Sequence, residues 1–225
     1  MSSIRPFSWS NNWQYLILPQ INAFGVITNV LNVIVFLNPK LEDPTFKYML
    51  ATSLNDILYL VLTSWNIFKY CSECPLYSSF ITQVYLIYLN DYFTSSLALF
   101  NILVDIVISF QRYMILINKS YCLNLSYKWI LFILMAISLT YYFPLLFFKD
   151  ILIISNTTMS NTSDEFVVKY AATKNKLGVS DVGRILPIVM TVGRIFLGVG
   201  VLTVINVLNA YEFRKRFLKK SILFF

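Results

Sequence analysis

The chain has 225 residues, of which 57% are hydrophobic and 13% are charged, and its mean hydropathy is +0.65. These values exclude an ordinary soluble domain of this length and indicate a membrane protein. The net charge of +7 does not by itself indicate a nucleic-acid-binding protein, because the basic run RKRFLKK directly follows an apolar segment. We interpret that run as an anchor at the cytoplasmic edge of a membrane.

Apolar segments long enough to cross a bilayer core, which takes roughly 20 helical residues, recur along the chain. They are continuously apolar and do not alternate, so they favour an all-α, multi-span transmembrane helix bundle over a membrane barrel. We assign residues 1–220 to one transmembrane domain and residues 221–225 to a short tail. The five expected spans are residues 13–36, 48–68, 83–117, 129–148 and 185–211.

The distribution of lysine and arginine predicts the orientation of this bundle. With the amino terminus outside, the short inner segments carry ten of these residues and the short outer segments carry two, Arg5 and Lys69. The long loop 149–184 carries five more, but its length weakens the rule. The amino terminus lacks the pattern of a removable signal peptide. We therefore expect a multi-pass plasma-membrane protein with an extracellular amino terminus.

Sequons give a weak check on this orientation. Asn156 and Asn161 begin sequons in the long outer loop and are candidate glycosylation sites. Asn118 and Asn124 also begin sequons, although they fall on the predicted inner side.

The cysteine and histidine content of the chain gives few indications of a disulfide, a metal site or a cofactor. Cys71 and Cys74 flank an outer loop as CSEC, and they either close a small strained disulfide or stay reduced. Cys122 stands alone on the inner side. The chain has no histidine, so we expect no metal site and no cofactor.

The third segment, 83–117, is polar along one face. At 100° per residue, one set of residues falls within about 80° of Asp105, while Ser96 on the far side is the exception. Charges in hydrocarbon cost a few kcal/mol or more each, so we expect Asp91 and Asp105 to face the bundle interior. Alternatively, the face joins helices through hydrogen bonds. Its members are Asp91, Thr94, Ser95, Ala98, Asn101, Asp105, Ser109 and Arg112.

Two charged residues are candidate ligand contacts. Asp91, near the outer end of the polar face, could pair with a cationic ligand group. Arg194, inside the fifth segment, could pair with an anionic group or with an acid from another helix, or could snorkel outward.

Four sequence features, taken together, resemble the rhodopsin-like class of seven-helix G-protein-coupled receptors. They are Asn29 in GVITNVLNVIVF, Asp56 in LATSLNDIL, the Pro-Thr of the first inner loop, and Arg112 in QRY. Pro144 in the fourth segment also fits. The resemblance covers essentially the whole chain, and its outline is most similar to invertebrate neuropeptide-receptor-like or orphan sequences.

The resemblance implies roles for particular residues. Arg112 and Tyr113 would contact a G protein at the cytoplasmic mouth of the bundle. Asn29 and Asp56 would share a hydrated, sodium-like polar core, to which we add Asp105 from the polar face.

Three departures qualify the resemblance. Gln111 replaces the acid that usually precedes the arginine, which removes a local restraint on the resting state. The loop 150–184 contains no cysteine, so the usual outer disulfide cannot form there. The motifs of helices six and seven are absent, so the chain resembles a receptor fragment truncated after the fifth helix. We expect these 225 residues alone to be poorly stable and unable to stimulate nucleotide exchange.

We therefore expect a receptor that passes the signal of an extracellular ligand to a cytoplasmic heterotrimeric G protein. The many outer aromatic residues suit a peptide ligand. No nucleophile motif or phosphate loop supports an enzyme. Two alternatives stay open: a transporter or channel subunit, whose spans also carry interior carboxylates, and a truncated receptor that associates with its full-length relatives.

Overall fold

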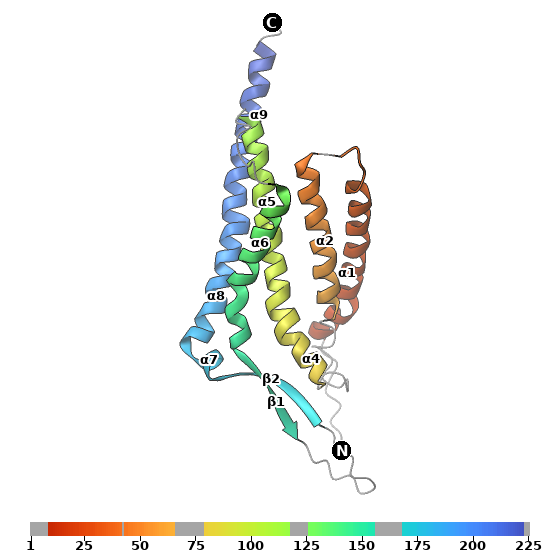
Figure 1. The fold of residues 1–225 in the computed structure, drawn as a ribbon, viewed down its shortest axis with the longest axis vertical. Coiled ribbons are helices and arrows are strands. Elements are labelled where there is room, and N and C mark those ends of the chain that lie inside the picture. The colour runs from red at the N-terminus through yellow and green to blue at the C-terminus, as the bar shows by residue number, and fades with distance from the viewer. Residues whose placement is uncertain (1–8, 42, 66–78, 118–125, 156–167, 223–225) are drawn as a thin grey trace.

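The computed structural model describes residues 9–41, 43–65, 79–117, 126–155 and 168–222. Within these ranges the chain is mostly helical, with long helices that run nearly side by side and one two-stranded hairpin at one end (Figure 1). Helices overlap all five segments in which the sequence predicts them.

The first two helices form an antiparallel pair. α1 (Trp9–Phe36) and α2 (Pro44–Ser64) are joined by a short turn. Asp43 caps α2, because its carboxylate accepts a hydrogen bond from the Thr45 amide at 2.7 Å. At the other end of the pair, the Asn22 amide of α1 donates to the hydroxyl groups of Thr63 and Ser64, at 3.4 and 3.2 Å. Polar side chains thus join α1 to α2.

The third helical segment is the centre of the bundle. It consists of α4 (Phe80–Val84), the π-helix η1 (Tyr85–Phe93) and α5 (Thr94–Leu116), which follow one another without a break. α5 packs against α2, α6 and α9. In this segment 39% of the span is buried, against 6% in α1, so the third segment supplies most of the interior.

The fourth segment changes helix type before it ends. α6 (Tyr127–Tyr142) passes into a short 3-10 helix, η2 (Phe143–Phe147), with Pro144 in its first turn. Proline has no amide hydrogen and cannot continue an α-helical ladder, which accounts for the change at this point.

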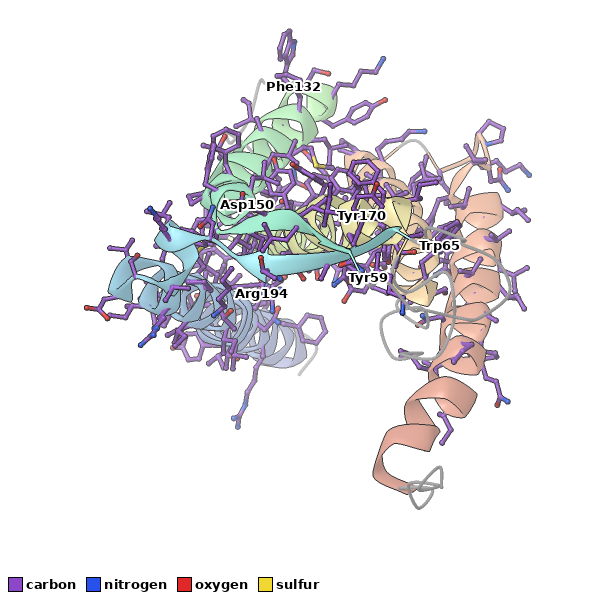
Figure 2. The ribbon with its side chains drawn as sticks, turned by 90° about the horizontal axis from the view of Figure 1, so that it is seen from below. Tyr59, Trp65, Phe132, Asp150, Tyr170 and Arg194 are labelled. Atoms are coloured by element: carbon purple, nitrogen blue, oxygen red, sulfur yellow. The ribbon has the colours of Figure 1, made fainter. Side chains whose placement is uncertain are left out.

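A β-hairpin follows directly. β1 (Lys149–Ser155) pairs antiparallel with β2 (Val168–Lys174), and Lys149 lies opposite Lys174. Seen from this end of the molecule, the two strands cross the ends of the helices (Figure 2). The prediction of a wholly helical fold missed this hairpin, because short apolar runs such as DILII do not reveal their conformation by periodicity.

The last part of the described chain is a short helix and one long helical rod. α7 (Lys176–Val179) turns the chain, and α8 (Asp181–Ile195), the π-helix η3 (Phe196–Val201) and α9 (Leu202–Ile222) then run the length of the bundle (Figure 1). Because α9 continues to Ile222, the first two residues of the expected tail at 221–225 are helical.

Four helical stretches of the described chain are long and apolar enough to cross a membrane: Ile17–Phe36, Phe80–Leu116, Tyr127–Phe147 and Asp181–Arg216. α2 is not among them, since Asn55, Asp56 and several hydroxyl side chains lower its hydropathy. The structure therefore supports a multi-span helical protein associated with a membrane. A membrane-crossing role for α2, and with it the count of five, stays a prediction.

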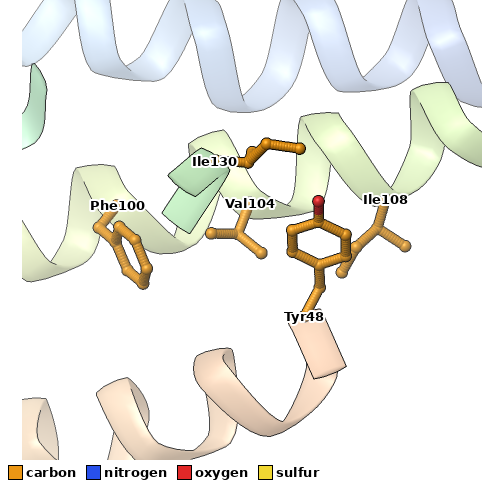
Figure 3. Packing of buried hydrophobic residues seen from close by; sticks show 5 residues of the cluster. All are labelled: Tyr48, Phe100, Val104, Ile108 and Ile130. Atoms are coloured by element: carbon orange, nitrogen blue, oxygen red, sulfur yellow. The ribbon is translucent and has the colours of Figure 1, made fainter. Parts of the chain in front are cut away.

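The main core lies where α2, α5 and α6 meet (Figure 3). Tyr48 of α2 inserts its ring toward Val104 and Ile108 of α5, and Phe100 and Ile130 complete the cluster. Large apolar side chains on the outer surfaces are exposed instead, as in the case of Phe132 on α6, at 65% (Figure 2). This pattern suits lipid as the surrounding solvent.

Candidate functional site

A cavity of about 360 Å³ lies at the hairpin end of the bundle. Its volume falls within the range of small-molecule sites. It opens between the third segment, the end of the fourth, both strands and α8. The cavity is lined by Asn90, Asp91, Ser95, Leu145, Phe148, Lys149, Lys174, Gly183 and Pro187.

An ion pair crosses this cavity. The Lys149 ammonium group, at the start of β1, contacts the Asp91 carboxylate of η1. The Asn90 amide donates a second hydrogen bond to the same carboxylate at 3.1 Å. Both charged side chains are partly exposed, at 37% for Lys149 and 29% for Asp91. The structure thus gives Asp91, a predicted ligand contact, a partner within the chain.

The local helix type places Asp91 at the cavity. Asn90 and Asp91 belong to the nine-residue π-helix η1, whose wider turn changes the direction in which side chains project relative to α5. Insertions of π-helix into α-helices occur frequently at functional sites. The irregular helix therefore coincides with the polar side of the cavity.

The hairpin is held over the cavity by contacts with both neighbouring segments. On one side, Gln83 of α4 accepts a hydrogen bond from the Ala172 amide at 2.8 Å, and the rings of Phe80 and Tyr170 meet edge to face at 5.4 Å. On the other side, the Asn175 side chain donates to the Phe147 carbonyl at 2.7 Å. These contacts hold β2 and the residue that follows it in place.

Two glycines allow the chain to turn tightly beside the cavity. A side-chain carbon at Gly178 would collide with the Phe148 carbonyl oxygen, and one at Gly183 would collide with the Leu177 carbonyl oxygen. The wall formed by α7 and α8 can approach the end of η2 only because these positions lack side chains.

A polar cluster joins α2 to α5 near the middle of the bundle. The Asn55 amide donates to the Leu97 carbonyl at 3.0 Å and to the Asn101 side chain at 2.8 Å, and the Asn101 amide donates to the Asp56 carboxylate. Asp105 is exposed, one turn further along α5, and lies close enough to Asp56 for the two carboxylates to interact.

Asn29 is not part of the hydrogen bonding recorded for this cluster. Its amide donates to the Gly25 carbonyl of its own helix at 2.9 Å. The Asn101 amide thus binds Asp56, and Asn55 binds Asn101, while the exposed Asp105 lies near Asp56 without a hydrogen bond from either amide among those described. Asn55 directly precedes Asp56 in α2, and this adjacency was the sign in the sequence that Asn55 belongs to the cluster.

At the end of α5 opposite the cavity, Arg112 is exposed and Tyr113 is half-buried. Gln111, the residue before them, lies within hydrogen-bonding reach of Tyr48 on α2. One turn earlier, the Ser109 carbonyl accepts a hydrogen bond from Asn209 of α9 at 3.0 Å. Side chains from two other helices thus meet α5 beside Arg112.

Arg194, the other predicted ligand contact, does not line the cavity described above. It lies close enough to the buried hydroxyl of Tyr142 for an electrostatic interaction. That hydroxyl has no hydrogen bond of good geometry with any described residue. Arg194 is half-buried, so it does not extend fully outward.

The remaining site predictions lie outside the described residues. These are the cysteine pair Cys71 and Cys74 and the sequons at Asn156 and Asn161. Among the described residues, no group of three or more metal-ligating side chains comes together.

Comparisons with known proteins add no relative to this description. No protein-family model matches the chain, and no curated protein is significantly similar to it. The fold and the hydropathy of its helices define a helical membrane-associated protein.

Proposed function

We propose that this chain is a rhodopsin-like receptor component that binds an extracellular ligand at the hairpin end and contacts a G protein at the Arg112 end. The single observation that carries this proposal is the arrangement along the third segment. Asp91 borders the cavity at one end, Asn101 joins the segment to α2 in the middle, and Arg112 is exposed at the other end. One helix therefore connects three features that a receptor needs.

The middle of this helix is suited to conveying a change from one end to the other. The Asn55, Asn101 and Asp56 side chains form an interhelical network whose members share hydrogen-bond partners. Such networks have discrete arrangements, and a ligand shifts their populations when it binds one arrangement more tightly. In this proposal the same cluster, with Asp105, is the site for a small cation such as sodium.

The orientation belongs to the same proposal. The hairpin and its cavity face the cell exterior, and the turn between α1 and α2 lies in the cytoplasm together with Arg112. Its support is the excess of lysine and arginine in the short segments at the Arg112 end. The protein then resides in the plasma membrane, with sequons Asn156 and Asn161 on the outer side.

Site-specific photo-crosslinking tests the contact with a G protein. A photoreactive phenylalanine analogue at Tyr113 should capture a Gα subunit in cells that express both proteins, because this position adjoins the exposed Arg112. The matched control carries the analogue at Phe132, which is 65% exposed on the lipid-facing side of α6 and should capture no Gα. Adding Arg112→Ala to the Tyr113 variant should abolish the product.

Two results would contradict the receptor proposal. One is capture of Gα at Phe132 and Tyr113 alike, which would show nonspecific contact. The other is the absence of capture at Tyr113 together with solute or ion flux through vesicles that contain the purified chain. That second result would favour a transporter or channel subunit.

A further inference from the structure

The cavity at the hairpin end carries more positive than negative charge. Lys149 and Lys174 both line it, and they face each other directly across the two strands. Directly opposed residues of an antiparallel pair lie on the same face, and like charges in this arrangement destabilise the sheet. The hairpin therefore brings two ammonium groups to one side of the cavity at an energetic cost.

The lining contains one carboxylate, Asp91, and Lys149 already contacts it. Asp150 alternates to the other face of β1, where its side chain interacts with Asn175 at 3.4 Å. Among the described residues, Lys174 has no ion-pair partner. The ammonium group of Lys174, an exposed side chain, thus has no counter-charge from the described residues.

The rest of the lining suits the body of an organic ligand. Leu145, Phe148 and Pro187 supply apolar surface, and the Ser95 hydroxyl supplies a hydrogen-bond donor. A cavity of about 360 Å³ has room for one aromatic or aliphatic side chain with a terminal charged group.

We propose that this cavity binds a carboxylate attached to an apolar group, with Lys174 as the contact for the anion beside the Asp91–Lys149 pair. A cationic ligand would have to displace Lys149 from Asp91 while Lys174 repels it. An anionic ligand meets Lys174 without breaking any contact. This assignment replaces the sequence-based expectation that Asp91 itself receives a cationic ligand group.

The inference rests on the proposed function, in which this cavity is the ligand site, but its test needs no G protein. The free carboxyl terminus of a peptide and a small organic acid share the required chemistry. The probes are therefore N-acetyl-Ala-Ala-Phe with a free carboxyl terminus, the same peptide as its primary amide, and 3-phenylpropionate. Binding to the full chain in lipid nanodiscs is measured by saturation-transfer NMR and calorimetry.

The acid peptide should bind at least about tenfold more tightly than the amide, which corresponds to the loss of one charge-assisted contact. Tighter binding of the acid peptide than of 3-phenylpropionate identifies a peptide terminus as the ligand class, and the reverse identifies a small acid. Lys174→Met should remove the preference for the acid. Lys169→Met is the matched control, because Lys169 lies on the same strand, opposite Ile154, and does not line the cavity.

A second variant keeps the test independent of Lys174. Asp91→Asn releases Lys149 and removes a repulsive charge, so binding of the acid peptide should become tighter. Equal binding of acid and amide, an unchanged preference in Lys174→Met, or binding of none of the three probes would overturn the proposal. If Tyr113 still captures Gα in that case, the receptor proposal stands and only the ligand class is wrong.

Discussion

Tyr48 of α2 lies within hydrogen-bonding reach of Gln111 of α5, the residue directly before Arg112. Tyr48 is 1% exposed, so its ring is fixed in the core while its hydroxyl meets the end of the helix. Rhodopsin-like receptors usually carry an acid at this position, and here a neutral amide lies near Tyr48 of another helix instead. In our account this contact restrains the Arg112 end in place of a local charge pair.

A double-mutant cycle measures this contact. Tyr48→Phe removes the hydroxyl and keeps the ring, so the free energy of unfolding in detergent micelles should fall by about 0.5–1 kcal/mol. In a Gln111→Met background the same substitution should have almost no effect, because the partner is already gone. An equal loss in both backgrounds would show that the hydroxyl does not act through Gln111.

The polar cluster between α2 and α5 should respond differently to two substitutions of Asp56. Asp56→Asn keeps an oxygen that can accept from Asn101, so stability should change little. Asp56→Leu leaves the Asn101 amide without this acceptor and should lower the free energy of unfolding by about 1–2 kcal/mol. Thermal unfolding of the two variants side by side checks the difference, and equal losses would argue against the hydrogen bond.

The glycine turn beside the cavity gives a steric prediction. Gly178→Ala should destabilise the chain by about 1–3 kcal/mol, because the added carbon collides with the rigid Phe148 carbonyl. Gly200→Ala is the control: the added carbon would lie 3.5 Å from the Phe196 ring, an ordinary contact, and alanine favours helix. If Gly178→Ala were as stable as Gly200→Ala, the described turn would be incorrect.

Substitutions of two phenylalanines distinguish core from lipid-facing surface. Phe100 is 4% exposed and packs in the main core, so Phe100→Ala should cost about 3–5 kcal/mol. Phe132→Ala, on the exposed side of α6, should change stability by less than about 1 kcal/mol in a lipid bilayer, where the ring has apolar surroundings in either state. Comparable losses at both positions would place α6 differently in the bundle.

Hydropathy predicted most of the helical segments because each long apolar run is a local feature of the sequence. The predicted range 13–36 ends at the same residue as α1, and the predicted range 129–148 covers nearly all of α6 together with η2. The polar face of the third segment also pointed to Asn101, which the structure joins to α2. These features depend on the period of a single helix, which the sequence displays directly.

The parts that the sequence did not predict all depend on contacts between distant residues. The ion partner of Asp91 is Lys149, 58 positions away, and no local pattern links them. The β-hairpin depends on pairing two strands whose nearest ends, Ser155 and Val168, are separated in the sequence by residues 156–167. Asn29 follows the motif of the resembled class, yet its amide bonds within its own helix. Register and helix rotation decide such contacts.

In our account, one chain presents the cavity on the outer side of a membrane and Arg112 on the cytoplasmic side. Cysteine labelling in sealed endoplasmic-reticulum vesicles tests it directly, because the vesicle lumen corresponds to the cell exterior. In a background with Cys71, Cys74 and Cys122 changed to serine, a membrane-impermeant maleimide should label Lys128→Cys in intact vesicles. It should label Lys169→Cys, on β2 of the hairpin, only after detergent is added. Labelling of Lys169→Cys in intact vesicles, with Lys128→Cys protected or equally labelled, would contradict the account.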